Sequence, residues 1–227
     1  MPVEDIVPRD EEQTLVLSPQ SLVLLRIGDA AIARLEAVNG AREKALADTR
    51  QIVRLSANAI RAVHRGDLTE SDSLLERANA MHTGLRSYRD DFPPVYWAGY
   101  VQDAQKEYVE ARIVRALIGE TPLPSPADLD IDESIYLNGL GEAAGELRRH
   151  LLDLLRAGDV AAAETTLAIM DDIFGLLVTV DYPDAVTHGL RRTTDLVRAV
   201  LERSRGDLTL TARQMHLEAA LRARTGN

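Results

Sequence analysis

Residues 132–159, "DESIYLNGLGEAAGELRRHLLDLLRAGD", have the pattern of one long α-helix, and this stretch decides the fold class. Asp132 is placed to start the helix, and Gly158 fits the left-handed residue that ends many helices. Apolar and polar residues do not alternate along it as they would in a half-buried strand. The other long segments share its Ala, Leu, Arg and Glu content, a composition that favours helices. The sequence therefore predicts an all-α protein.

Six further helices are predicted between the proline clusters and glycines that interrupt the chain. The first is unusually long, because Ser18 fits an N-cap, Pro19 fits a first helical residue, and the pattern continues to His64. One protomer cannot bury all the apolar residues of such a helix, which predicts an oligomer. The other helices are expected at about residues 69–89, with Thr69 as the N-cap, 93–118, 160–180, 183–205 and 211–222. Residues 18–227 would form one domain, and the acidic residues 1–17 a disordered tail.

Three of the predicted helix ends carry a similar short pattern: "HRGD" at 64–67, "RAGD" at 156–159 and "SRGD" at 204–207. One interpretation of Arg-Gly-Asp is an adhesion motif. The other is a helix end, in which the arginine lies in the last turn, the glycine is left-handed and the aspartate starts the next segment. The recurrence of the pattern at boundaries predicted from other signals favours the helix end.

The composition excludes several classes of protein. The 227 residues include no cysteine, which removes disulfides, zinc–thiolate sites, iron–sulfur clusters and cysteine nucleophiles. No apolar run reaches the roughly 18 to 20 residues that cross a bilayer, and the acidic N-terminus does not resemble a secretory signal. We therefore expect a cytoplasmic protein with no membrane partner. The net charge of -10 excludes a uniformly basic nucleic-acid binder but leaves room for a local basic patch.

Two pairs of glutamates are spaced so that each pair shares one face of a helix. Glu142 and Glu146 lie four residues apart, and Glu107 and Glu110 lie three apart in the helix expected at 93–118. If these two helices are antiparallel neighbours, four carboxylates meet, and a divalent cation would relieve their repulsion. Oxygen ligands without His or Cys suit Mg²⁺ or Mn²⁺. The alternative for each pair is a solvated helix face.

The surroundings of Glu142 and Glu146 argue against a solvated face for that pair. Their neighbours are small or apolar, and Gly139, Gly141 and Gly145 each weaken a helix by up to about 1 kcal/mol unless close packing compensates. Carboxylates on a closely packed helix need a partner. Without a cation, the four carboxylates should hold at least one proton at neutral pH, because neighbouring negative charges raise pKa values.

Three segments in this order, "QKEYVEA" (105–111), "YLNGLGEAAGEL" (136–147) and "IMDDIFGLL" (169–177), resemble the translin superfamily, which comprises translin and translin-associated factor X (Trax). The resemblance extends from about residue 27 to about residue 208. It implies a single domain of seven helices with a long N-terminal helix. It also implies assembly into a hollow, barrel-like octamer that holds single-stranded nucleic acid inside.

The resemblance also implies a role for the glutamates. In this family the Trax-type subunit is the Mg²⁺-dependent endoribonuclease, and its catalytic acidic positions match Glu107, Glu110, Glu142 and Glu146 here. Glu142 stands where Trax has an aspartate, one methylene shorter, which would shift the cation by about an ångström. Animal translin lacks an acid at that position, so this chain is more similar to the nuclease-type subunit.

A basic stretch of the helix expected at 69–89 is the candidate path for nucleic acid. Arg77, Arg86 and Arg89 are spaced along it with Tyr88 beside them, and family members carry a basic stretch in this region. Arginine pairs with phosphates and stacks on bases, and tyrosine also stacks. The alternative is an ordinary charged helix face, in which the arginines pair with the aspartates at 90 and 91.

Three functions remain open after these observations. The first is a homo-oligomeric endoribonuclease that uses Mg²⁺ or Mn²⁺ to cleave single-stranded RNA, with the four glutamates as metal ligands and catalytic residues. The second is a non-catalytic protein that binds single-stranded DNA or RNA. The third is a helical scaffold that binds a protein partner through its long first helix.

Overall fold

The computed structural model describes residues 18–225. All the regular secondary structure in that range is helical, and turns and loops connect the helices. The all-α prediction is therefore confirmed, while the disorder expected for residues 1–17 lies outside the described residues. Within the described residues, none of the helices combines the length and the apolar content that crossing a membrane requires. Contacts divide the chain into two units, one that ends at Gly40 and one that starts at Ala41.

The first unit contains the N-terminal part of helix α1, which spans Pro19–His64 as predicted. Seven of its large apolar side chains are exposed by 47% to 69% of their surface. Their clustering on one short segment is typical of a surface that meets another protein. These residues are Leu22, Val23, Leu24, Leu25, Ile27, Ile32 and Leu35.

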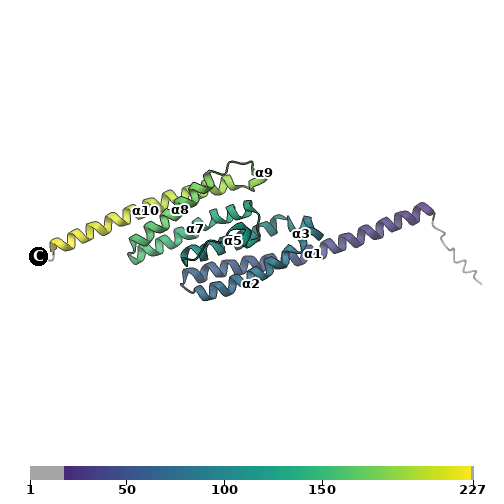
Figure 1. Ribbon diagram of the computed structural model, residues 1–227, viewed down its shortest axis with the longest axis horizontal. Helices are drawn as coiled ribbons and strands as arrows, with labels where there is room; N and C mark the ends of the chain where they lie inside the picture. Colours follow the sequence, from purple (N-terminus) through teal and green to yellow (C-terminus); the bar gives the residue numbers. More distant parts are fainter. Residues whose placement is uncertain (1–17, 226–227) are drawn as a thin grey trace, which may run out of the picture. The chain divides into compact units, whose positions relative to one another are not determined.

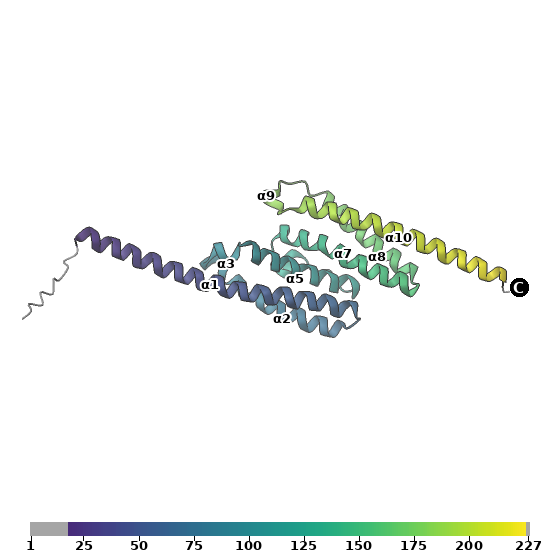
Figure 2. The same ribbon diagram turned by 180° about the vertical axis from the view of Figure 1, so that it is seen from behind.

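The second unit is a bundle built around α7 (Glu133–Ala157), which packs against three other long helices. These are α5 (Gly99–Ile118), α8 (Val160–Val178) and α10 (Leu190–Thr225). In both ribbon views α7 lies between α5 on one side and α8 with α10 on the other (Figure 1; Figure 2). Leu140, Leu147 and Leu151 of α7 are buried, so this helix supplies the centre of the core.

The remaining elements of the second unit complete the α5 side and the connections. Helix α2 (Leu68–Arg86) packs on α5. Four helices of four residues each fill the loops: α3 (Tyr88–Asp91), α4 (Pro93–Tyr96), α6 (Pro126–Leu129) and α9 (Asp184–Thr187). The helix predicted over 93–118 is therefore interrupted after Tyr96 and resumes at Gly99. The N-cap of the second predicted helix lies two residues earlier than expected, because Asp67 and not Thr69 caps it and accepts from the Glu70 N–H at 3.0 Å.

The helix-end interpretation of the repeated glycine pattern is confirmed at two of its three positions. Gly66 and Gly158 have φ values of 78° and 83°, in the left-handed region where glycine is favoured. It is wrong at 204–207, because α10 continues through Gly206 and joins the two helices predicted at 183–205 and 211–222. Arg148 of α7 binds this segment, donating to Ser204 at 3.0 Å and to Asp207 at 2.7 Å. These contacts need the segment in helical register, which overrides the weak propensity of one glycine.

Candidate metal centre

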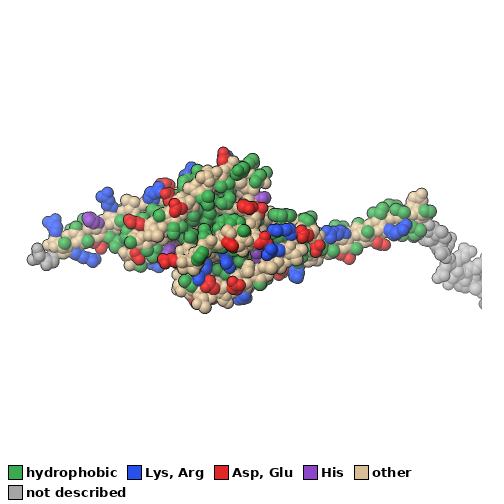
Figure 3. Space-filling model, in the orientation of Figure 1, with side chains coloured by type: hydrophobic (Ala, Val, Ile, Leu, Met, Phe, Trp, Pro, Cys, Tyr) green, Lys and Arg blue, Asp and Glu red, His purple; other side chains and the backbone are tan. Residues whose placement is uncertain are grey.

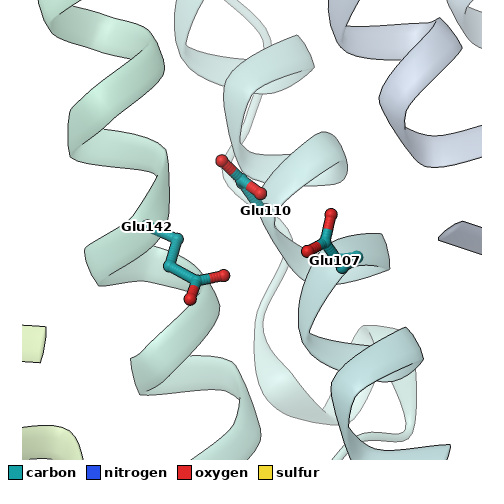
Figure 4. Close-up of side chains that lie close together, drawn as sticks. All are labelled: Glu107, Glu110 and Glu142. Atoms are coloured by element: carbon teal, nitrogen blue, oxygen red, sulfur yellow. The ribbon is translucent and has the colours of Figure 1, made fainter. Parts of the chain in front are cut away.

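Three of the four predicted glutamates meet where α5 packs against α7. Glu107 and Glu110 come from α5 and Glu142 from α7, and each offers a carboxylate oxygen within 4.8 Å of the other two (Figure 4). All three side chains are half-buried. We call Glu107, Glu110 and Glu142 the carboxylate cluster. The two glutamate-bearing helices are therefore neighbours, which is the condition under which their glutamates were expected to meet.

A glycine on α7 makes this close approach possible. A Cβ atom on Gly139 would lie 2.7 Å from Cγ1 of Val109 and 2.9 Å from the carbonyl oxygen of Lys106, so no larger residue fits without moving α5. Gly141 similarly lets Thr193 of α10 approach, since its Cβ would lie 2.4 Å from the Thr193 methyl group. Gly145 meets nothing within 4 Å, so close packing explains two of the three glycines.

The cluster holds a proton at neutral pH. Burial, followed by the charges of the neighbouring glutamates, raises the pKa of Glu110 from its ordinary 4.5 to about 8. Burial and the charge of Glu142 also raise the pKa of Glu107. Glu110 is therefore protonated at pH 7, in line with the prediction made from repulsion alone. Mutual repulsion of this kind makes the cluster receptive to a cation.

Glu146 stands apart from the other three because it already has a partner. Nε2 of His64, at the end of α1, donates a hydrogen bond to Oε2 of Glu146 at 2.6 Å. This bond lowers the pKa of Glu146, against the opposing effect of burial. The His64 side chain is only 3% exposed, and its Nδ1 atom has no hydrogen-bond partner among the described residues. Glu146 therefore stays ionised close to the cluster.

Lys106 supplies the cluster with an internal counterion. Its Nζ atom lies 2.8 Å from Oε1 of Glu142, and the two side chains are 27% and 36% exposed. Burial lowers the pKa of Lys106, but the hydrogen bond and the charge of Glu142 outweigh burial, so that the pKa is raised. One ammonium group thus offsets part of the charge of three carboxylates.

The donor set fits a hard divalent cation. Three carboxylates and no imidazole or thiolate provide the oxygen ligands that Mg²⁺ and Mn²⁺ prefer, and water completes such shells. A cation at this place would displace the proton of Glu110 and compete with the Lys106 ammonium for Glu142. The cluster therefore has the composition of a metal site.

Two of the predicted nucleic-acid residues share an acid that the sequence did not indicate. Arg86 forms an ion pair with Asp130, and Nη1 of Arg89 lies 3.9 Å from the same carboxylate. Arg89 also donates to the Tyr96 hydroxyl at 2.9 Å. Tyr88 packs edge-on against Phe92, and Arg77 is exposed. Arg86 and Arg89 still have 44% and 41% of their side chains exposed.

The charges on the surface are mixed. On the face shown in Figure 3, acidic and basic side chains are interspersed over the helices of the second unit. A ligand with a phosphate backbone would therefore meet local cationic positions and not a continuous basic field.

Two residues of the centre, His64 and Lys106, were missed as functional residues by sequence reasoning. His64 is 82 residues from Glu146, and its sequence position shows only that it ends a helix. Lys106 precedes Glu107 and is one of two lysines in the chain, and this rarity was the one available signal. Neither pairing follows from helical periodicity, because both depend on how the helices pack.

Comparison with known proteins shows which chains this one is similar to. No family model matches the sequence. The chain is 30% identical to the uncharacterized protein MJ0175 of Methanocaldococcus jannaschii over 184 residues, which are 80% of this chain and 81% of that protein.

Solved structures extend the similarity to the fold. The crystal structure of AfC3PO is 31% identical, with a TM-score of 0.76, over 82% of this chain and 97% of that chain. The structure of AfC3PO in complex with duplex RNA gives the same identity and TM-score, over 82% of this chain and 96% of that one. The crystal structure of apo-NeC3PO is 21% identical with a TM-score of 0.74, over 81% and 96% of the two chains, and shows the fold alone.

Proposed function

We propose that this chain, which belongs to the translin superfamily, is a metal-dependent endoribonuclease of the translin/Trax type. Membership rests on the relatives at 30% and 31% identity, because C3PO proteins are translin- and Trax-like. The activity is inferred from one observation: the carboxylate cluster brings three acids together, and Lys106 is the one cation among the described residues that forms an ion pair with them.

Glu107, Glu110 and Glu142 would hold Mg²⁺ or Mn²⁺ between α5 and α7. When bound, such a cation acidifies a water molecule and stabilises the charge that develops on a phosphodiester. Glu110 releases its proton on binding, because its raised pKa comes from burial and from the neighbouring negative charges. The close packing at Gly139 fixes the distance between the ligands of the two helices.

Glu146 has a separate role in this proposal. Its pKa is lowered by the His64 hydrogen bond, so it is a weak base at neutral pH. An ionised carboxylate held in one orientation suits the alignment of an attacking water by accepting a hydrogen bond. His64 acts through Glu146 and is therefore a positioning residue.

The proposed substrate is single-stranded RNA, held inside an oligomeric barrel that we take to be a homo-octamer in the cytoplasm. The similar protein AfC3PO forms a complex with duplex RNA, which supports RNA as the ligand class for this chain. The exposed apolar residues of α1 support assembly, as do Leu176, Val178, Tyr182 and Val186 of the second unit, which are 49% to 69% exposed. Arg77, Arg86, Arg89 and Tyr88 would contact the strand away from the cluster.

A non-catalytic protein that binds single-stranded DNA or RNA is the second candidate function. Lys106 favours it, because an ammonium group that already pairs with Glu142 reduces the need for a cation. In that case the carboxylate cluster is a structural remnant, and RNA binding would be indifferent to Mg²⁺.

Incubation of an end-labelled single-stranded RNA with the protein in Mg²⁺, Mn²⁺ or EDTA separates the two functions. We expect internal cleavage in Mg²⁺ or Mn²⁺, none in EDTA, and none with Glu110→Gln. Glu164→Gln is the matched control, since Glu164 is an exposed glutamate of α8 outside the cluster. Binding without cleavage in all three conditions would support the non-catalytic function instead.

A further inference from the structure

A cleft of about 420 Å³ adjoins the carboxylate cluster. Lys106 of α5 and Glu142 of α7 belong to its wall, and the first turn of α10 closes another side with Arg192 and Thr193. A volume of this size is typical of small-ligand sites. Because Glu142 belongs both to the cluster and to the cleft, a ligand in the cleft would lie next to a cation in the cluster.

The wall of the cleft is fixed by a buried amide. Asn138 of α7 is 5% exposed and donates to the carbonyl oxygens of Ser134 at 2.8 Å and Thr187 at 2.9 Å. Its Oδ1 atom accepts a hydrogen bond from the Thr193 hydroxyl at 2.7 Å. Together with the close approach at Gly141, these bonds hold the start of α10 against α7. The cationic side chain of Arg192 is therefore carried by a fixed element.

Arg192 is placed where an arginine is unfavourable unless an anion is near. It lies in the first turn of α10, a helix of 36 residues, and the positive end of the helix dipole disfavours a cation there. The first turn of α10 contains no acidic residue. Arg192 is exposed and forms no ion pair with any of the described residues. A bound anion would satisfy both the arginine and the helix end.

The cleft also has an apolar side. Ile135 is buried in its wall, and Leu196 is 59% exposed. The imidazole of His188 lines the rim, at a residue with a left-handed φ of 50° that turns the chain from α9 into α10. The carboxylates of Asp103 and Glu142 also line the cleft, next to the two cationic side chains of Lys106 and Arg192. The two cations and the apolar side match the phosphate and the base of one nucleotide.

We propose that this cleft binds one nucleotide of the RNA strand beside the scissile phosphodiester, with its phosphate between Lys106 and Arg192. The guanidinium of Arg192 suits two parallel hydrogen bonds to phosphate oxygens, and Lys106 supplies a point charge. The inference rests on the proposed function, since it needs RNA as the substrate. It adds a subsite that fixes which phosphodiester reaches the cluster.

The test compares two adjacent arginines of α10. Arg192→Gln removes the cleft cation, whereas Arg191→Gln removes an exposed arginine that lines a different cavity with Asp184. Binding of a labelled single-stranded RNA is measured in EDTA by fluorescence anisotropy over a range of salt concentrations. We expect Arg192→Gln to bind about tenfold more weakly at low salt. Its slope of log affinity against log salt should shrink by about 0.7, the value for one lost phosphate contact on a single strand.

Arg191→Gln should bind RNA like the parent protein. If the parent binds and cleaves RNA but the two variants behave alike, the subsite is wrong and the proposed function stands. If the parent protein binds no RNA, both the proposed subsite and the proposed function are wrong. A third measurement titrates adenosine 5′-monophosphate: loss of its binding in Arg192→Gln with unchanged RNA binding would indicate a small-molecule site and overturn the assignment to the strand.

Discussion

The carboxylate cluster and the two arginines where α2 is followed by α3 are both groups of like charges, yet the fold treats them in opposite ways. Arg86 at the end of α2 and Arg89 in α3 share the carboxylate of Asp130, and Arg89 also bonds to Tyr96. In the cluster, Lys106 is the one side chain that forms an ion pair with any of the three glutamates among the described residues, and Glu110 keeps a proton. Charges with partners stabilise a fold, whereas charges left in mutual repulsion indicate a ligand.

The largest expected effect comes from removing the charge of Glu110. Glu110→Gln keeps the shape of the side chain and takes away one ligand, so metal-dependent cleavage should fall by about 100-fold or more. Stability without metal should stay about equal at pH 7, where Glu110 is protonated, and should exceed that of the parent protein above pH 8, where the ionised Glu110 of the parent repels its neighbours. Cleavage assays and thermal melting in EDTA measure the two effects, with Glu164→Gln as the control. Cleavage at the parental rate would remove Glu110 from the site.

The pH dependence of stability is the next test of the same repulsion. A folded-state pKa of about 8 for Glu110 against an ordinary 4.5 means that the folded protein binds the proton more tightly. This contribution to stability is fully present below pH 4.5 and is lost as the pH rises through 8. The melting temperature without metal should therefore fall across this range more steeply in the parent protein than in Glu110→Gln. Identical slopes would contradict the raised pKa.

Lys106→Gln should change metal binding and substrate binding in opposite directions. Without the ammonium group, Mg²⁺ or Mn²⁺ no longer competes for Glu142, and its affinity should rise about three- to fivefold. The KM for RNA should rise, because the phosphate loses a cationic partner. Calorimetry measures the affinity for the cation, and steady-state cleavage measures the KM for RNA. Weaker metal binding in this variant would show that Lys106 supports the metal centre and does not compete with it.

Per unit of charge changed, the smallest effect is expected at the arginines that already have partners. Replacing Arg86 and Arg89 together with glutamate should weaken binding of single-stranded RNA by about tenfold at low salt, which is modest for a double charge reversal. The effect should vanish at high salt, because salt screens the attraction between exposed arginines and phosphates. Anisotropy titrations at two salt concentrations measure the affinity for RNA. Unchanged affinity at low salt would show that Arg86 and Arg89 do not take part in RNA binding.

Local signals predicted the parts of the structure that depend on neighbouring residues. Ser18 and Pro19 marked the start of α1, the left-handed glycines marked two helix ends, and Gly139 indicated a close helix contact beside an acid. The grouping of Glu107, Glu110 and Glu142 followed from spacing combined with one assumption about which helices are neighbours.

Contacts between residues far apart in the chain could not be predicted from the sequence. Asp130 lies 44 residues from Arg86, and His64 lies 82 residues from Glu146, so neither pair could be found from periodicity. The continuation of α10 through Gly206 depends on Arg148, which belongs to another helix. In each case tertiary packing chose between partners or conformations that the local sequence leaves equally open.

The proton of Glu110 allows the most direct test of metal binding at the carboxylate cluster. Calorimetric titration of Mn²⁺ at pH 7, in two buffers with different ionisation enthalpies, gives the number of protons released on binding. We expect about one proton per site from the parent protein, and close to none from Glu110→Gln with weaker binding. Absence of Mn²⁺ binding, or binding that releases no proton and is unchanged in the variant, would contradict a metal centre at Glu107, Glu110 and Glu142.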